Sequence, residues 1–305
     1  MISLQAVRSR KNHNQNPASE RILICTDLDR TLLPNGTQPE SPHARERFRN
    51  FVARPEVSVA YVTGRHRELV LAAIEEYQLP LPEYVIGDVG TSIYTIENNQ
   101  WNLWNSWHKE IGVGWHGLTH DALVALLADL ELLRLQEPEK QNTFKLSYYV
   151  VPTIDINKLL TEMQKRLDQK QITASLIWSV DETTNTGLLD ILPAAATKRH
   201  AVEFLMTEQG FTLDNTLFAG DSGNDLPVLI SPIHSVLGAN ATDEVRTQAV
   251  QMATALGTED ALYLASGNLL GMNGNYSAGI LEGCVHYMPE ILAWIDEESQ
   301  HDLSL

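Results

Sequence analysis

The sequence predicts an α/β fold with a mostly parallel sheet, into which a smaller α+β domain is inserted. Short apolar strands alternate with amphipathic helices in the first and last parts of the chain, a pattern typical of βαβ units around a parallel sheet. The middle part has instead a β-α-β-β order, which favours a small antiparallel sheet. We therefore expect a discontinuous core at 21–104 and 190–305 and an inserted domain at 105–189.

The individual elements follow from apolar runs, helical spacing and turn residues. In the first part we expect strands at 21–26, 57–62 and 84–86, a hairpin through residue 96, and helices at 42–53 and 66–77. In the middle we expect helices at 117–135 and 155–169 and strands at 144–151, 172–180 and 187–192. In the last part we expect strands at 215–219 and 235–237 and helices at 198–209, 225–230, 242–255 and 276–288. Residues 1–20 are polar without an apolar run, so we expect a disordered leader and no signal peptide.

The composition restricts the class of partner. The 305 residues include 22 Lys and Arg against 39 Asp and Glu, which gives a net charge of −17. This acidity argues against nucleic-acid and anionic-membrane partners, because phosphate groups are held by clustered Lys and Arg. No run approaches the roughly 18 apolar residues of a membrane helix. Cys25 and Cys284 cannot form a disulfide framework, so we expect a cytoplasmic protein, and the lack of a long coiled coil favours a monomer.

Two carboxylates directly follow the first predicted strand. The segment Asp27-Leu28-Asp29-Arg30-Thr31 begins where the apolar run ends, and open α/β sheets bind ligands at the carboxyl ends of their strands. One carboxylate can attack phosphorus to form an aspartyl-phosphate, while a second carboxyl donates and accepts protons. Taken alone, these residues are equally compatible with two acids at a strand end followed by a turn.

An acidic loop follows the strand at 215–219. It reads Gly220-Asp221-Ser222-Gly223-Asn224-Asp225, and the carboxylates of Asp221 and Asp225 are the oxygen ligands that Mg²⁺ prefers. A plain turn would also explain this loop by itself. Two acidic strand ends in one sheet are harder to explain in that way, because clustered anions are costly without a cation between them.

Two weaker signals complete the set. Thr63 and Gly64 end the second strand where a helix starts, and hydroxyl and backbone N–H groups at such a position can hold phosphate oxygens. Lys198 begins the helix that follows the inserted domain and can neutralise a phosphoryl group. In isolation, a helix cap and a solvated lysine are the simpler explanations.

The four motifs in this order resemble the haloacid dehalogenase (HAD) superfamily of phosphotransferases. The region between Thr63 and Lys198 resembles its IIB cap type, which implies a HAD-like Rossmannoid core with an inserted α+β cap. A narrower similarity is to sucrose-phosphate phosphatases, and it rests on residues 85–94, 144–148, 189–193 and 274–283. The turn at 194–197 and the leader depart from that family's pattern and leave the exact sugar open.

The resemblance implies a role for each motif. Asp27 would be the nucleophile and Asp29 the general acid/base. Mg²⁺ would be held by Asp27, the backbone carbonyl of Asp29 and Asp221, with Asp225 nearby. The resemblance also implies a phosphate site at Thr63, Gly64 and Lys198 and support of the metal loop by Ser222 and Asn224.

The cap would determine which molecule is hydrolysed. Lys145, Ser147 and Tyr148 lie on the matched cap strand and are the candidates for contacting the sugar, with a plain surface strand as the alternative. Four tryptophans gather at the entrance to the cap, and core packing explains them better than stacking on a sugar. They are Trp101, Trp104, Trp107 and Trp115.

The resulting hypothesis is a Mg²⁺-dependent phosphatase of a phosphorylated disaccharide, with sucrose 6-phosphate as the first candidate. Mannosylfructose phosphate, another glycosyl phosphate or a general sugar phosphate are alternative substrates. A non-catalytic sugar-phosphate-binding protein is an alternative of another class, but binding alone does not require a nucleophile beside an acid/base. A two-carboxylate glycosidase would leave Lys198 and the acidic loop unexplained.

Overall fold

The computed structural model describes residues 21–181 and 184–296, so the predicted leader lies outside the described residues. The chain divides into two compact units, one formed by Met1–Val59 with Met206–Leu305 and the other by Ala60–Leu205. This division does not coincide with the inserted domain expected at 105–189, whose borders remain a prediction. Among the described residues, no helix combines the length and the apolar character needed to cross a membrane.

The first unit is built on parallel strands. Strand β1 (Ile22–Thr26) pairs with β10 (Thr216–Gly220), β10 pairs with β11 (Ser235–Leu237), and β11 pairs with β12 (Leu262–Leu264). Thr26 is aligned with Ala219, so the segments that begin with Asp27 and Asp221 leave neighbouring strands at the same end. The residues of β1, β10 and β11 are all buried, as their apolar runs predict.

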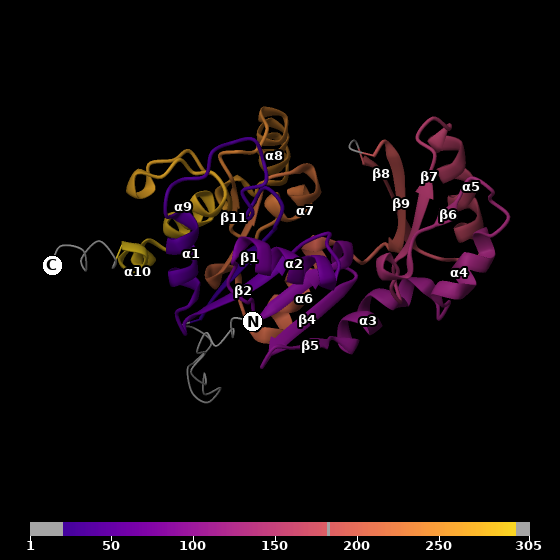
Figure 1. Cartoon of the computed structure of the whole chain (residues 1–305), viewed down its shortest axis with the longest axis horizontal. Coiled ribbons are helices and arrows are strands. Elements are labelled where there is room, and N and C mark those ends of the chain that lie inside the picture. Colours follow the sequence, from indigo (N-terminus) through magenta and orange to yellow (C-terminus); the bar gives the residue numbers. More distant parts are fainter. Residues whose placement is uncertain (1–20, 182–183, 297–305) are drawn as a thin grey trace. The chain divides into compact units, whose positions relative to one another are not determined.

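Helices enclose the strands of this unit. Its helices are α1 (Ala44–Val52), α7 (Leu226–Leu229), α8 (Asp243–Leu256), α9 (Ser277–Tyr287) and α10 (Leu292–Asp296). Helix α9 lies beside α1 and β11 (Figure 1), and its residues are buried over most of its length. Cys25 on β1 and Cys284 on α9 are buried free thiols, and burial raises the pKa of both.

The second unit contains two separate groups of strands. In the first group, the last residues of β2 (Val57–Val62) pair in parallel with β3 (Tyr84–Gly87), and β3 pairs antiparallel with β4 (Ser92–Glu97). Strand β5 (Gln100–Leu103) completes the hairpin with β4, which confirms the hairpin expected there. The adjoining helices are α2 (Arg67–Tyr77), α3 (Asn105–Gly112) and α6 (Lys198–Gln209), the last of which runs into the first unit.

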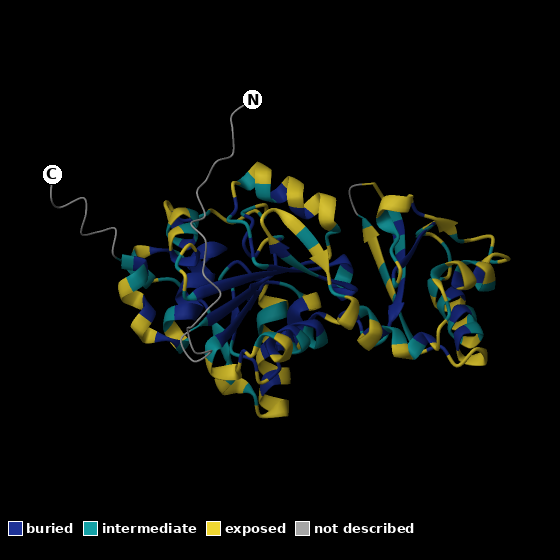
Figure 2. Ribbon diagram, turned by 90° about the horizontal axis from the view of Figure 1, so that it is seen from below, coloured by how far each residue is buried: buried dark blue, intermediate teal, exposed yellow. Residues whose placement is uncertain are grey.

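The second group is an antiparallel sheet in the order β6-β7-β9-β8. Its strands are β6 (Arg134–Leu135), β7 (Leu146–Val150), β8 (Ala174–Asp181) and β9 (Thr186–Pro193). Helices α4 (His120–Leu127) and α5 (Ile156–Gln169) lie on one side of it (Figure 1) and close a core with the inward residues of β7 and β9. In Figure 2 the outer residues of helices are exposed while the interior strands are dark blue. The small antiparallel sheet that the β-α-β-β order predicted is therefore present in the structure.

One predicted helix is wrong in extent. The helix expected at 117–135 ends at Leu127, and the chain continues through turns in which Leu130 N–H and Leu133 N–H bond to carbonyls three residues earlier. Arg134 and Leu135 then pair with β7 as strand β6. The apolar spacing at 128–135 fits a helix, but pairing with β7 determines the conformation, since tertiary contacts override local propensity.

Close packing around Gly187 gives a stability prediction for the antiparallel sheet. A Cβ atom there would lie 2.4 Å from the carbonyl oxygen of Val150 and 2.1 Å from the Trp178 ring. We expect Gly187→Ala to lower the free energy of unfolding by about 1–3 kcal/mol, because overpacked sites must shift backbone or side chains. Urea titration measures this, with exposed Ser179→Ala on β8 as the control, expected within about 0.5 kcal/mol of the parent protein. An unchanged Gly187→Ala protein would contradict the packing.

Candidate active site

The end of β1 fixes the position of Asp27. Its backbone N–H donates to the carbonyl of Ala219 at 2.9 Å, which extends the parallel ladder by one residue. The Thr26 hydroxyl donates to the carbonyl of Asp27 at 2.8 Å, and the Asp27 side chain is buried. Asp27 is therefore held by the sheet itself, which gives the predicted nucleophile a rigid backbone.

Three buried carboxylates come together in the first unit. Asp27, Asp221 and Asp225 each offer an oxygen atom, and these atoms all lie within 4.8 Å of one another. The Thr31 hydroxyl donates to Asp221 at 3.1 Å, and the half-exposed Arg30 lies 3.4 Å from the same carboxylate. Buried like charges at this spacing favour a cation between them, and a set of carboxylate oxygens suits a hard divalent ion. The residues present fit Mg²⁺.

The acidic loop is held by its own hydrogen bonds. One oxygen of Asp225 accepts from the N–H groups of Asp221 and Ser222 at 3.1 and 3.2 Å, and the Ser222 hydroxyl lies 3.2 Å from it. The same hydroxyl lies 2.8 Å from the side-chain oxygen of Asn224. Ser222 and Asn224 thus contribute hydrogen bonds within the loop, while Gly220 leaves the room that Asp225 occupies, since a Cβ there would meet it at 2.7 Å.

Asp29 stands apart from the three clustered carboxylates. The side-chain N–H of Asn35 donates to Asp29 at 2.7 Å, and the oxygen of Asn35 accepts from the N–H of Arg30 at 2.8 Å. Asn240 donates to the carbonyl of Arg30 at 2.6 Å, so the turn after the nucleophile is fixed from two sides. Neither asparagine stands out in the sequence as a site residue. Asn35 stands in Pro34-Asn35-Gly36, which indicates a turn but not its partner.

The predicted phosphate-binding residues all belong to the second unit. Thr63 is buried, donates its N–H to the carbonyl of Ile86 at 2.8 Å and accepts from the N–H of Arg65 at 3.2 Å. Beside it, a Cβ placed on Gly64 would meet nothing within 4 Å, so the turn borders open space. Lys198 is buried at the first position of α6. The geometry therefore gives these residues defined places, and their joint role in binding phosphate remains a prediction.

The three cap residues differ in their surroundings. Lys145 is only 8% exposed, and no hydrogen bond or ion pair joins its ammonium group to the described residues. The Ser147 hydroxyl contacts the carboxylate of Asp190 and lies 3.2 Å from the carbonyl of Lys140. Tyr148 packs in the core beneath α4 and α5, because successive residues of a strand face opposite sides, and burial raises its pKa to about 12. The prediction that Tyr148 contacts the sugar is not supported by this position.

The tryptophans pack within the second unit. Trp107 and Trp115 are fully buried, and Trp107 donates its indole N–H to the carbonyl of Gly90 at 3.1 Å. Trp104 has its ring edge-on to Tyr84, and Trp101 is placed similarly against Tyr94. These contacts agree with the packing role that was favoured over stacking on a sugar.

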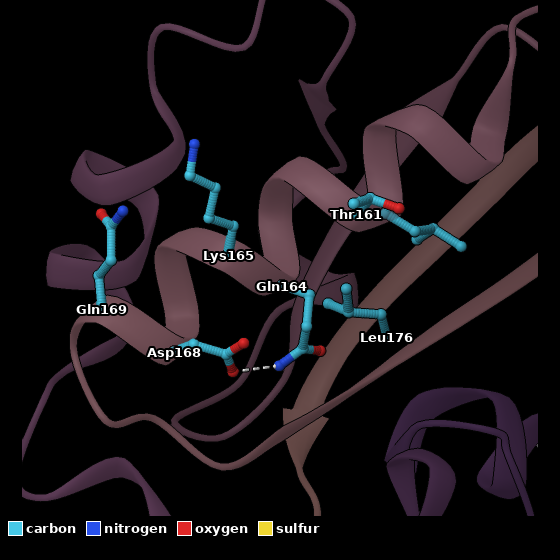
Figure 3. Close-up of a pocket in the computed structure, with 7 residues that line it drawn as sticks. Thr161, Gln164, Lys165, Asp168, Gln169 and Leu176 are labelled. Atoms are coloured by element: carbon cyan, nitrogen blue, oxygen red, sulfur yellow. Dashed lines mark hydrogen bonds between the residues drawn. The ribbon is translucent and has the colours of Figure 1, made fainter.

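A surface hollow between α5 and β8 contains none of the predicted site residues. Figure 3 shows Gln164 donating to Asp168, at 2.8 Å, with Lys165 pointing outward from the same helix. The lining mixes single polar groups with Leu176 of β8 and lacks a cluster of acids or nucleophiles. This hollow therefore offers no alternative to the carboxylates at the strand ends as a candidate site.

The fold and these carboxylates define the class of protein. Parallel strands that end in Asp27-x-Asp29-x-Thr31 and in an acidic loop, together with a separate antiparallel sheet, define a HAD-like hydrolase. More specifically, the chain belongs to the sucrose-6F-phosphate phosphohydrolase family, whose model matches residues 20–288. Members of this family are phosphoric monoester hydrolases, and the chain is a phosphatase of the sugar-phosphate class.

Curated relatives support the family assignment. A protein of Nitrosococcus oceani, named as a HAD-like hydrolase, is 52% identical over 286 residues, which cover 93% of this chain and 77% of the relative. The mannosylfructose-phosphate phosphatase of Agrobacterium fabrum is 29% identical over 234 residues, 75% of this chain and 87% of the relative. Sucrose-phosphatase 2 of Nicotiana tabacum is 26% identical over 244 residues, 76% of this chain but only 53% of the relative.

Solved structures support the fold. The sucrose-phosphatase of Synechocystis, determined with sucrose and phosphate, is 24% identical with a TM-score of 0.66 over 88% of this chain and 98% of that chain. A HAD-like hydrolase of Bacillus subtilis is 18% identical with a TM-score of 0.63 over 88% and 96%. These similarities confirm the predicted α/β fold class with a cap domain.

The packing of Gly220 gives a prediction about metal binding. We expect Gly220→Ala to displace Asp225 and to weaken binding of Mg²⁺ or Mn²⁺ by at least about tenfold, which corresponds to about 1.4 kcal/mol. Calorimetric titration of the purified protein with each ion measures this. Gly223→Ala is the matched control in the same loop, because a Cβ there meets nothing within 4 Å. Equal affinity in both variants would contradict the assigned cation site.

Proposed function

We propose that the protein hydrolyses a phosphorylated disaccharide in a Mg²⁺-dependent reaction, with sucrose 6-phosphate as the first candidate substrate. The observation that carries this proposal is the buried cluster of Asp27, Asp221 and Asp225, which puts the expected nucleophile within 4.8 Å of two further carboxylates. A binding protein would not need such a costly arrangement of like charges. Family membership supports the choice of a sugar phosphate.

In the proposed reaction, a carboxylate oxygen of Asp27 attacks the phosphorus atom and the bond from phosphorus to the sugar oxygen breaks. Asp29, oriented by Asn35, gives a proton to the departing sugar oxygen. Asp29 then takes a proton from water, whose oxygen attacks the aspartyl-phosphate and releases inorganic phosphate and free Asp27. Thr63 and Lys198 bind the phosphoryl oxygens during both steps, with Gly64 keeping the turn open.

The metal would be held by the side chains of Asp27 and Asp221 and by the backbone carbonyl of Asp29, with Asp225 close by. When bound, Mg²⁺ neutralises charge on the phosphoryl oxygens. Ser222 and Asn224 contribute by bracing the loop that carries Asp221. In this proposal Asp225 mainly shapes the loop, since it accepts the loop N–H groups, whereas Asp221 faces the metal and accepts from the Thr31 hydroxyl.

The sugar would be contacted from the cap. Lys145 and Ser147 stay in the proposal, because Lys145 is buried without a hydrogen bond or ion pair to the described residues and Ser147 adjoins Asp190. A second candidate substrate is mannosylfructose phosphate, since the relative at 29% identity is named as a phosphatase of that compound. We also propose a cytoplasmic location, in keeping with two buried, unpaired thiols. The lack of a long coiled coil in the sequence supports a monomer.

Replacing the nucleophile tests the mechanism. We expect Asp27→Asn to lower kcat by at least about a thousandfold, because an amide is a poor nucleophile toward phosphorus. Steady-state phosphate release measures kcat, and circular dichroism checks that the fold is kept. Asp214→Asn, an exposed acid of the same unit, serves as the charge control. Substantial hydrolysis by Asp27→Asn would assign the nucleophile to another residue.

A substrate panel tests the function. With Mg²⁺ present, we expect hydrolysis of sucrose 6-phosphate or mannosylfructose phosphate to exceed that of trehalose phosphate and glucose 6-phosphate in kcat/KM. We expect EDTA to stop the reaction and added Mg²⁺ to restore it. Equal rates on all four compounds would refute a disaccharide-specific enzyme, and activity that persists in EDTA would refute the metal assignment.

A further inference from the structure

The turn after β3 has a strained backbone. Asp88, Val89 and Gly90 have φ values of +51°, +59° and +90°, so three successive residues are left-handed. This conformation is uncommon outside glycine and unusual for a β-branched residue such as Val89. A strained segment persists only where its surroundings hold it, so the contacts of this turn indicate what it is built to position.

Hydrogen bonds hold the turn at both ends. Asp88 N–H donates to the carbonyl of Arg65 at 3.0 Å, and the Thr91 hydroxyl donates to the carbonyl of Asp88 at 2.9 Å. The indole of Trp107 donates to the carbonyl of Gly90. These bonds fix the direction of the Asp88 side chain, which no step of the proposed reaction uses.

The Asp88 carboxylate is buried and lies near cations. It is 5% exposed and accepts from the Ser92 hydroxyl at 3.2 Å. Burial raises the pKa of Asp88, while the charges of Lys145 and His66 oppose that rise. His66 is itself hydrogen-bonded to Glu68 at 2.9 Å. Lys145 is thus the cation near Asp88 that has neither a hydrogen bond nor an ion pair with the described residues.

The turn that carries Lys145 is tied to the turn that carries Asp88. Asn142 and Lys145 exchange backbone hydrogen bonds at 3.1 and 3.3 Å, which closes a tight turn. The side chain of Asn142 then donates to the Thr91 hydroxyl at 2.8 Å. The backbone that carries Lys145 is therefore linked through Asn142 and Thr91 to the turn that carries Asp88, although no ion pair within 4 Å joins the two side chains.

The same turn also touches the start of α6. A Cβ on Gly90 would lie 3.2 Å from the carbonyl carbon of Thr197 and 3.4 Å from the backbone nitrogen of Lys198. One strained turn therefore adjoins both the residue proposed to bind phosphate and the turn that carries the residue proposed to bind sugar. It links the two ends of the expected substrate site within one compact unit.

We propose that Asp88 is a positioning residue that holds the ammonium group of Lys145 toward the sugar part of the substrate and so contributes to selection of the leaving group. This inference rests on the proposed function of the same site. A carboxylate beyond ion-pair distance attracts the ammonium group without occupying its N–H donors, which stay available to sugar oxygens.

The test removes the negative charge of Asp88 without changing the backbone conformation of the turn. Asn tolerates left-handed backbone, so Asp88→Asn keeps the local shape and removes only the negative charge. We expect KM for the preferred disaccharide phosphate to rise about tenfold, while kcat changes much less, because the lost interaction acts on binding. KM for p-nitrophenyl phosphate should rise less, since that compound has no sugar hydroxyl groups.

A double variant distinguishes positioning from a general structural role. If Asp88 acts through Lys145, then Asp88→Asn combined with Lys145→Met should raise KM no further than Lys145→Met alone. Glu97→Gln, which removes an exposed charge from neighbouring β4, is the control and should leave the kinetics unchanged. An unchanged KM in Asp88→Asn, or independent effects in the double variant, would overturn the proposal.

A separate measurement keeps the inference apart from the proposed function. If the unaltered protein hydrolyses no sugar phosphate, the proposed function fails. Thermal unfolding of the two single variants and the double variant then tests whether Asp88 and Lys145 interact. We expect the Tm shifts of Asp88→Asn and Lys145→Met to be non-additive, because each removes the partner of the other. Additive shifts would show that the two residues do not interact.

Discussion

Three acids that repel one another at the ends of buried strands are the constraint on which the first unit depends. Asp27, Asp221 and Asp225 are held close although like charges in a buried site oppose it. The surrounding sequence compensates with small residues and donors: Gly220 gives room, Ser222 supplies an N–H and a hydroxyl, and the parallel ladder fixes the backbone before Asp27. The fold therefore maintains an arrangement that is suited to a cation.

The second unit carries the residues proposed to bind phosphate and the residues proposed to bind the sugar, and the structure relates the two sets to one another. It does so with backbone conformation instead of charge clustering. A left-handed turn at 88–90 lies against the first residues of α6, and a chain of hydrogen bonds through Thr91 and Asn142 reaches the turn that carries Lys145. Short, local bonds of this kind set separations that a flexible side chain alone would not keep.

The sequence was most informative where chemistry coincides with strand ends. The apolar runs before Asp27 and Asp221 predicted both strands, and strand pairing brought these two carboxylates to one edge. The alternation of side chains along a strand also divides 144–151 into two faces, but it does not show which face the helices cover, and Tyr148, a candidate for contacting the sugar, lies on the face toward the core. Arg134 and Leu135 gave no local sign of pairing with β7.

The residues that could not be identified from the sequence have one property in common, which is that their contacts come from distant parts of the chain. Asn240 reaches the carbonyl of Arg30 across more than two hundred positions, and Asp88 is significant because a cap lysine lies near it. Such contacts depend on the assembled fold and leave no spacing pattern in the chain. The border between the two compact units is also not visible in the sequence. Contacts group residues 60–205 into one unit, although this unit contains two separate sets of strands.

The buried thiols of the first unit have a practical consequence. Cys25 on β1 lies two residues before Asp27, and Cys284 lies inside α9, which packs against α1 and β11. Because burial disfavours the thiolate, neither group reacts readily while the unit is closed. Each therefore serves as a native reporter of opening, and the rate at which a thiol reagent labels it measures how often β1 and α9 are exposed.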